Sequence, residues 1–245
     1  GAQAGAAGRR EDRALIEAVV FDAAGTLIRP AEPVGETYAR LARAHGVDVP
    51  AWRLDEAFRR VLASAPPMVF PGAAPAEIPA HERAWWRAVV RAVFRAADQM
   101  QAFADFEACF AALFAHYADP ASWRAAPGAH DALRALRAEG RRLAVASNFD
   151  ERLPALLAGL GLDAHLEAVW LPAALGAAKP DPAFFAAVAA RLGVAPAAAL
   201  YVGDDPAEDL EPARRAGWRT IDVRALATLG RLPGQIRALE ETAAP

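Results

Sequence analysis

Helices and short apolar strands alternate along the second half of the chain, and this alternation restricts the fold more than any other feature of the sequence. Each predicted helix is followed by a glycine, which is typical of helix C-termini. The predicted helices cover 129–139, 151–160, 182–192 and 208–216, and the predicted strands cover 142–147, 168–171, 199–203 and 219–223. Repeated strand–helix units of this length predict an α/β fold, a doubly wound parallel sheet with right-handed crossovers.

An earlier apolar run, 18–21, ends directly at Asp22 and is followed by the turn residues Gly25 and Thr26. A strand that is apolar at every position is typical of a sheet covered on both faces. A carboxylate at the C-terminal end of such a strand lies in the crevice where open α/β sheets bind ligands. Asp22 is therefore a candidate nucleophile, although this stretch taken alone favours an ordinary turn-forming aspartate.

A long region without strand character follows the first strand and continues to about Pro120. Apolar residues recur there with helical spacing in four segments, 38–45, 54–62, 82–100 and 103–117. The segment 66–79 contains five prolines and is predicted to be a loop. We therefore expect an insertion of about four helices.

The insertion interrupts the α/β domain just after its first strand. This order predicts a core domain at 15–29 and 121–245 that carries a helical lid at 30–120. Residues 1–14 lack apolar periodicity and are expected to form a flexible arm. Their alanine and arginine content resembles a trimmed transit peptide, but Glu11 and Asp12 argue against one, so a cytoplasmic protein is expected.

Composition and charge exclude several classes of protein. The net charge is −3 and no basic run exceeds an arginine pair, so neither nucleic acid nor an anionic membrane is an expected partner. The longest apolar stretches, such as 184–190, fall far short of the ~20 residues that cross a bilayer. Cys109 is the only cysteine, which excludes a disulfide framework within one chain and favours a core position. A monomer or a homodimer is expected.

Two further stretches carry polar side chains that suit a phosphate. Ser147 and Asn148 follow the predicted strand 142–147 and bring a hydroxyl and turn amides to the edge where Asp22 is expected. Lys179 is the only lysine among 27 basic residues and lies just before a predicted helix. A lysine in a chain that otherwise uses arginine indicates a need for a compact ammonium group.

Four carboxylates fall within six residues, Asp204 to Asp209, at the end of the strand 199–203. Such a cluster repels itself unless a cation or solvent screens it. Oxygen ligands favour a hard ion, most plausibly Mg²⁺, over zinc. An acidic helix N-terminus exposed to solvent is the alternative interpretation.

The order of these features resembles the haloacid dehalogenase (HAD) superfamily, subfamily I, in which a helical cap is inserted after the first motif of a Rossmann-like core. The resemblance covers about 19–223. Within the superfamily, two features resemble the branch of the rhythmically expressed gene products and the HAD-like hydrolase domain-containing protein 3. They are the Trp85–Trp86 pair and the segment Ser147–Asp150 followed by Arg152 and Leu153.

The resemblance implies a Mg²⁺-dependent phosphatase acting on a small phosphorylated molecule. Asp22 would form an aspartyl-phosphate, and Lys179 would bind the phosphoryl group together with Ser147 and Asn148. The implied metal ligands are Asp22, the backbone carbonyl of Ala24 and Asp204, with Asp205 or Asp209 supporting the metal from the next layer of residues.

Ala24 departs from the phosphatase pattern. Phosphatases of this superfamily usually carry a second aspartate two residues after the nucleophile, and it serves as the general acid and base. Loss of such a group typically lowers a rate by ~10²–10⁴-fold. The nucleophile, the phosphate-binding residues and the metal site would all remain, so the sequence predicts a slow or selective phosphatase.

Two alternatives stay open. A non-catalytic or weakly catalytic protein that binds a phosphate ligand would need no general acid. A 2-haloacid dehalogenase would also need none, because halide leaves without a proton, but the acidic cluster at 204–209 indicates a metal that dehalogenases do not use. A phosphonoacetaldehyde hydrolase is nearly excluded, because it needs a lysine in the cap. Substrate selectivity is expected from the lid, where the candidate residues are Glu32, Glu36, Tyr38, Trp85, Trp86 and Arg87.

Overall fold

The computed structural model describes residues 15–242, and the arm predicted at 1–14 lies outside them. A five-stranded parallel sheet forms the centre, in the spatial order β5-β4-β1-β6-β7. The strands are β1 (Ala18–Phe21), β4 (Arg142–Ala146), β5 (Ala168–Trp170), β6 (Ala199–Gly203) and β7 (Arg219–Asp222). The predicted α/β class and parallel sheet are confirmed.

β1 is the middle strand and is buried on both faces. Val19 and Phe21 belong to one apolar cluster, whereas Ala18 and Val20 belong to a second cluster on the opposite face. Successive side chains of a strand point to opposite faces, so a continuous apolar run is what a doubly covered strand requires. This central position places the residue after β1 at the middle of the sheet edge.

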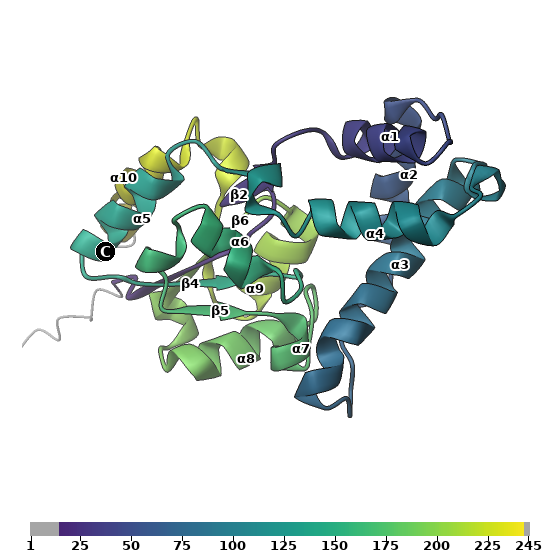
Figure 1. Cartoon of the computed structure of the whole chain (residues 1–245). Coiled ribbons are helices and arrows are strands. Elements are labelled where there is room, and N and C mark those ends of the chain that lie inside the picture. Colours follow the sequence, from purple (N-terminus) through teal and green to yellow (C-terminus); the bar gives the residue numbers. More distant parts are fainter. Residues whose placement is uncertain (1–14, 243–245) are drawn as a thin grey trace, which may run out of the picture.

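Helices cover both faces of the sheet (Figure 1). The described helices of this part are α5 (Ala129–Ala138), α6 (Leu153–Gly159), α7 (Pro172–Leu175), α8 (Pro182–Leu192), α9 (Glu211–Arg215) and α10 (Leu232–Thr242). Side chains of α5, α6 and α10 complete the apolar cluster that contains Phe21, and side chains of α8 complete the cluster that contains Val20. The core thus has three layers, with helices on either side of the sheet.

The helical insertion is a separate layer beside this core (Figure 1). It consists of α1 (Val34–Ala44), α2 (Ala51–Ala63), α3 (Ile78–Ala96) and α4 (Phe106–His116) with their loops. Its own apolar cluster includes Tyr38, Leu54, Val93, Phe94 and the fully buried Cys109. The insertion therefore has a core that does not depend on the sheet.

A short antiparallel ribbon joins the insertion to the core. β2 (Ile28–Pro30) carries the chain out of the core and pairs with β3 (Trp123–Ala125), which carries it back. The ribbon is not predicted from the sequence, because strands of three residues are too short to show an alternating pattern. This pairing holds together the two segments through which the chain leaves and re-enters the core.

Some helix boundaries differ from the prediction. α3 begins at Ile78 rather than at Glu82, since Pro79 fits the first turn of a helix, where no backbone donor is needed. The helix predicted at 208–216 begins as a wide turn over Pro206–Leu210 and becomes α-helical only at Glu211. α10 was not predicted. None of the helices within 15–242 has the length and apolar character that a membrane crossing requires.

Candidate active site

The residues predicted to carry chemistry meet at one edge of the sheet. Asp22 follows β1, Ser147 follows β4 and Asp204 follows β6, and these three strands are neighbours. Parallel strands present their carboxyl ends at the same edge, so residues far apart in sequence come together there. Lys179 reaches this edge from the loop before α8, and all four residues line one pocket.

Lys179 joins two of the carboxylates. Its side chain is buried, and Nζ donates to Asp22 Oδ1 at 2.7 Å and to Asp209 Oδ1 at 2.5 Å. Burial alone lowers the pKa of Lys179, but the charges of Asp22 and Asp209 outweigh it and hold the pKa well above its usual value. Asp22 Oδ2 accepts no hydrogen bond from any described residue, so this oxygen is available as a nucleophile.

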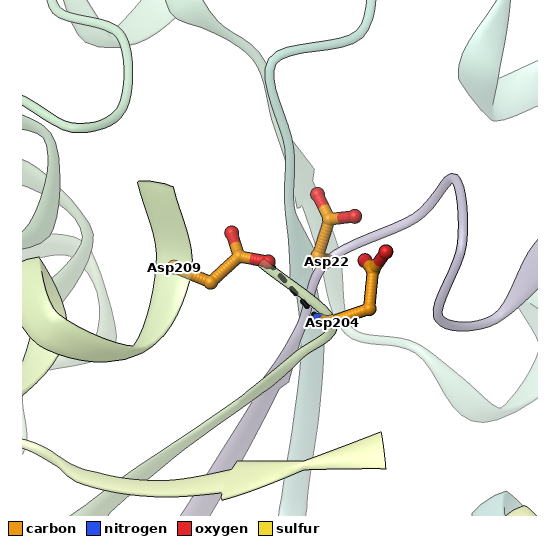
Figure 2. Close-up of side chains that lie close together, drawn as sticks. All are labelled: Asp22, Asp204 and Asp209. Atoms are coloured by element: carbon orange, nitrogen blue, oxygen red, sulfur yellow. Dashed lines mark hydrogen bonds between the residues drawn. The ribbon is translucent and has the colours of Figure 1, made fainter. Parts of the chain in front are cut away.

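Three carboxylates gather around the same point (Figure 2). One oxygen from each of Asp22, Asp204 and Asp209 lies within 4.8 Å of the others. Burial, reinforced by the charges of Asp22 and Asp209, raises the pKa of Asp204 to about 6. One lysine cannot balance three carboxylates, and an all-oxygen donor set suits Mg²⁺. The residues therefore fit the divalent ion that the acidic cluster predicted.

The carboxylates of Asp204 and Asp209 differ in how they are held. Asp209 Oδ2 accepts from the backbone N–H groups of Asp204 and Asp205, each at 3.2 Å, and its other oxygen accepts from Lys179. Asp204 Oδ1 accepts from Thr26 Oγ1 at 3.2 Å, and Oδ2 accepts no hydrogen bond within the described chain. Asp204 thus keeps a free oxygen, as a direct ligand needs, while Asp209 is fully engaged.

Two local features support this arrangement. Gly25 has a φ of +92°, and a Cβ there would lie 2.5 Å from Asp204 Oδ2, so only glycine lets the two segments approach. Asp205 is exposed, and its carboxylate accepts from the N–H groups of Ala207 and Glu208 at 2.8 and 3.0 Å. Asp205 therefore caps the turn that carries Asp209, and it is not among the three converging carboxylates.

Backbone and side-chain groups suited to a phosphate lie beside Asp22. Within residues 15–242, the N–H groups of Ala23, Ala24 and Asn148 donate no hydrogen bond, and neither does Ser147 Oγ. Free N–H groups at the end of a strand form a concave site for an anion. The pocket is lined here by Ala24, Ser147 and Asn148.

The Asn148 side chain has a different role from the one predicted. Its Nδ2 donates to the Lys179 carbonyl at 2.9 Å, and its Oδ1 accepts from the Lys179 N–H at 2.8 Å. This pair of bonds fixes the backbone of Lys179 opposite Asp22. The Asn148 side chain thus positions the lysine, and its backbone N–H is the group left for a phosphate.

The pocket has a volume of about 380 Å³ and walls of two kinds. All of its charged lining residues belong to the core, and the contribution of the insertion is entirely uncharged. The insertion residues are Val34, Tyr38, Phe58, Leu62, Trp85, Trp86, Val90, Phe110, Leu113, Phe114 and Tyr117. The core therefore forms a charged wall of the pocket, here called the floor, and the insertion residues form an apolar wall that faces it, here called the roof.

Of the lid residues named as candidates, Tyr38, Trp85 and Trp86 line the pocket. The charged candidates Glu32, Glu36 and Arg87 do not line it. Glu32 accepts from Thr37 and Arg40, and Arg87 pairs with Glu107 at the surface. Glu36 is exposed and is not among the lining residues.

A group of contacts that the sequence analysis missed joins the insertion to the core. Trp86 Nε1 donates to Asp150 Oδ2 at 2.5 Å, and Arg152 donates to both oxygens of Asp150 at 2.8 and 2.6 Å. The Arg152 guanidinium also lies 4.1 Å from the centre of the Phe114 ring. Asp150 and Arg152 served only to identify the branch, and nothing in their spacing indicated a partner in the insertion.

Glu82 of α3 adds a second bond across this boundary. Its Oε2 accepts from the Glu151 N–H at 2.9 Å, and its Oε1 is buried without a partner in the described chain. Burial raises the pKa of Glu82 to about 7, although the hydrogen bond from the Glu151 N–H lowers it; the charges of Asp150 and Glu151 add smaller raising effects, and Arg152 a small lowering one. The carboxyl group is therefore held between its two protonation states near neutral pH.

The variant Glu82→Gln is expected to flatten the pH dependence of stability. The ordinary pKa of 4.5 applies in the unfolded chain, so between about pH 4.5 and 7 the folded state keeps a proton that the unfolded state releases. Wild-type stability should fall as pH rises through this window, whereas glutamine has no proton to lose. Thermal unfolding measured from pH 4.5 to 8 should show that the melting temperature of the variant rises relative to that of wild type only at the higher pH values.

Glu36→Gln, at an exposed position of α1, is the matched control and should leave the pH profile unchanged. Parallel profiles for wild type and Glu82→Gln would contradict the assignment.

Comparison with known proteins agrees with this geometry. Residues 16–217 match the family model described as haloacid dehalogenase-like hydrolase. The human haloacid dehalogenase-like hydrolase domain-containing protein 3 is 36% identical over 210 residues, covering 85% of this chain and 82% of the human protein. The branch predicted from the sequence is confirmed.

Solved structures show the same fold. L-2-haloacid dehalogenase from Xanthobacter autotrophicus is 26% identical, with a TM-score of 0.62 over 93% of this chain and 86% of the dehalogenase. A HAD phosphatase from Thermococcus onnurineus is 21% identical, with a TM-score of 0.58 over 90% of this chain and 97% of the phosphatase. On the family match, the relatives and the shared fold, the chain belongs to the haloacid dehalogenase-like hydrolase family.

Proposed function

We propose that this hydrolase is a Mg²⁺-dependent phosphatase that acts on a small phosphorylated molecule through an aspartyl-phosphate at Asp22. The observation that carries the proposal is the convergence of Asp22, Asp204 and Asp209 on one point, with Lys179 bonded to the first and last of them, beside free N–H groups that suit phosphate oxygens. Halide release needs no metal, so three carboxylates at one point favour the phosphatase over a dehalogenase.

Phosphoryl transfer then occurs in two displacements. Asp22 Oδ2 attacks phosphorus and forms a P–O bond, while the bond from phosphorus to the leaving oxygen breaks and that oxygen keeps the electron pair. The leaving group takes a proton from water. In the second step water attacks phosphorus, loses a proton to solvent, and breaks the bond to Asp22, which releases inorganic phosphate and restores the carboxylate.

Each residue of the site has a part in these steps. Lys179 holds Asp22 Oδ1 so that Oδ2 points to the phosphate, and its positive charge stabilises the equatorial oxygens. Ser147 Oγ and the N–H groups of Ala23, Ala24 and Asn148 bind the remaining oxygens. Asp22, Asp204 and the Ala24 carbonyl would hold Mg²⁺, which neutralises charge on the phosphoryl oxygens when bound. Asp209 fixes Lys179 and the turn that carries Asp204.

Ala24 determines which substrates the protein hydrolyses rapidly. A methyl group stands where phosphatases carry the general acid, so the leaving oxygen departs without a proton from the protein. We expect the logarithm of kcat/KM to fall steeply as the pKa of the leaving group rises, with acetyl phosphate and p-nitrophenyl phosphate far ahead of alkyl phosphates. A flat dependence across such a series would disprove this explanation.

Phosphate release from p-nitrophenyl phosphate and acetyl phosphate, with and without Mg²⁺, tests the function itself. Turnover that requires Mg²⁺ supports the proposal. Binding of phosphate ligands with no turnover over a broad panel would instead indicate a non-catalytic protein.

A dehalogenase is the second candidate, and Ala24 together with the apolar roof of the pocket favours it. Halide release needs no acid, and a small apolar acid would fit that roof. Release of chloride from 2-chloropropionate without added metal would establish this activity in place of the phosphatase.

A further inference from the structure

We propose that the substrate is a phosphate monoester whose organic group is an uncharged aromatic ring system, an aryl phosphate rather than a sugar or amino-acid phosphate. This inference rests on the proposed phosphatase function, because it assigns the organic half of the molecule that Asp22 would dephosphorylate. It comes from the roof of the pocket, to which the catalytic residues contribute nothing.

Aromatic side chains are concentrated at this one place. The chain contains 11 Phe, 6 Trp and 3 Tyr, and nine of these 20 side chains line the pocket. Seven come from the insertion: Tyr38, Phe58, Trp85, Trp86, Phe110, Phe114 and Tyr117. Several meet edge to face, as Trp85 does with Trp86 at 5.0 Å between ring centres. Aromatic rings prefer such offset and edge contacts, so this wall offers a further ring both faces and edges to pack against.

The nitrogen donors near the roof are already engaged, and the hydroxyl of Tyr117 is the one buried roof group without a partner in the described chain. Trp85 Nε1 donates to the Pro66 carbonyl at 2.8 Å, and Trp86 Nε1 donates to Asp150. Arg152 is the one cation in the described pocket lining besides Lys179, and Asp150 neutralises it through two hydrogen bonds. A sugar hydroxyl or a second charged group would lose its water here and find few partners in return.

The size of the pocket also suits an aryl phosphate. An apolar cavity of ~150 Å³ holds a benzene molecule. The pocket here has about 380 Å³, which leaves room for a phosphate at the floor and one or two fused rings under the roof. Loss of the general acid at Ala24 fits as well, because a phenolate departs more readily than an alkoxide.

Binding of non-hydrolysable phosphonates tests the inference separately from turnover. We expect 1-naphthylmethylphosphonate to bind at least ~100-fold more tightly than methylphosphonate, because it buries some ten apolar carbon atoms. Calorimetry in Mg²⁺ buffer measures both. Turnover gives a second comparison, in which kcat/KM for each aryl phosphate is divided by kcat/KM for glucose 6-phosphate. After correction for the pKa of the leaving group, this ratio should be larger for 1-naphthyl phosphate than for p-nitrophenyl phosphate.

Helix α2 offers a matched pair of variants. Leu62 lines the pocket and is 39% exposed, and Trp52 on the same helix is 67% exposed and is not a lining residue. Leu62→Gln should weaken naphthylmethylphosphonate binding by about fivefold, roughly the loss of one partly buried apolar group, and leave methylphosphonate binding unchanged. Trp52→Gln should change neither.

The two proposals fail in different ways. Selective phosphonate binding without turnover of any phosphate would support the aromatic pocket and overturn the phosphatase. Mg²⁺-dependent turnover combined with equal affinity for the two phosphonates would support the phosphatase and overturn the aromatic substrate.

Discussion

Replacing Asp22 by asparagine is expected to reduce phosphate release by ~10⁴-fold or more, because the amide cannot attack phosphorus to form the covalent intermediate. Asparagine keeps the size of aspartate and an oxygen that can accept from Lys179 Nζ, so the variant should fold normally. It also removes one of three converging negative charges, which relieves repulsion with Asp204 and Asp209. Initial rates with acetyl phosphate in Mg²⁺ buffer measure the loss.

The control for this experiment is Asp204→Asn. That change weakens the metal site and leaves the nucleophile intact, so part of its lost activity should return as the Mg²⁺ concentration is raised. Asp22→Asn should show no such return at any Mg²⁺ concentration. Equal rates for Asp22→Asn and wild type would mean that a contaminating phosphatase, or another residue, carries the activity.

Lys179→Met is expected to have the largest effect on stability. Its side chain and those of Asp22 and Asp209 are buried, with 4%, 8% and 2% of their surfaces exposed. Removing one partner from a buried ion pair typically costs about 3–5 kcal/mol, because the remaining charge has neither water nor a counterion. Two carboxylates would be left here, so the free energy of unfolding should drop by at least that amount in metal-free buffer.

Urea denaturation with and without Mg²⁺ checks this effect. Mg²⁺ should restore part of the stability of Lys179→Met, since it also balances the carboxylates, and Lys179→Met/Asp209→Asn should be more stable than the single variant. Arg43→Met is the matched control, because Arg43 and Asp48 form an exposed pair worth less than about 1 kcal/mol. A loss for Lys179→Met no larger than that of Arg43→Met would contradict the buried triad.

Most of the fold could be predicted because its signals are local. Apolar runs followed by glycine-terminated helices are properties of neighbouring residues, and they identified all five sheet strands. The ribbon of β2 and β3 could not be predicted, because its pairing joins residues 28–30 to 123–125 across the whole insertion. Asp209, in the wide turn before α9, is held by Lys179, and this contact joins residues 30 positions apart, so no local pattern shows it.

The site was predictable where one strand end supplies one functional group, as at Asp22, Ser147 and Asp204. The role of the Asn148 side chain could not be predicted, because it bonds to the backbone of Lys179, and a sequence does not show which backbone groups a side chain will meet. The contacts of Glu82 and Trp86 with the core likewise depend on how the insertion lies over the sheet. The apolar roof could be suspected from Trp85 and Trp86 alone, but its other aromatic residues come from three further helices and their loops.

Phosphorylation of Asp22 is the central claim, and mass spectrometry of the protein quenched in acid during turnover of acetyl phosphate with Mg²⁺ tests it most directly. We predict one phosphoryl group on the peptide that contains Asp22, dependent on Mg²⁺ and absent from Asp22→Asn. Phosphate release by a protein whose Asp22 remains unmodified under the same quench, with the Asp22→Asn variant equally active, would contradict the account.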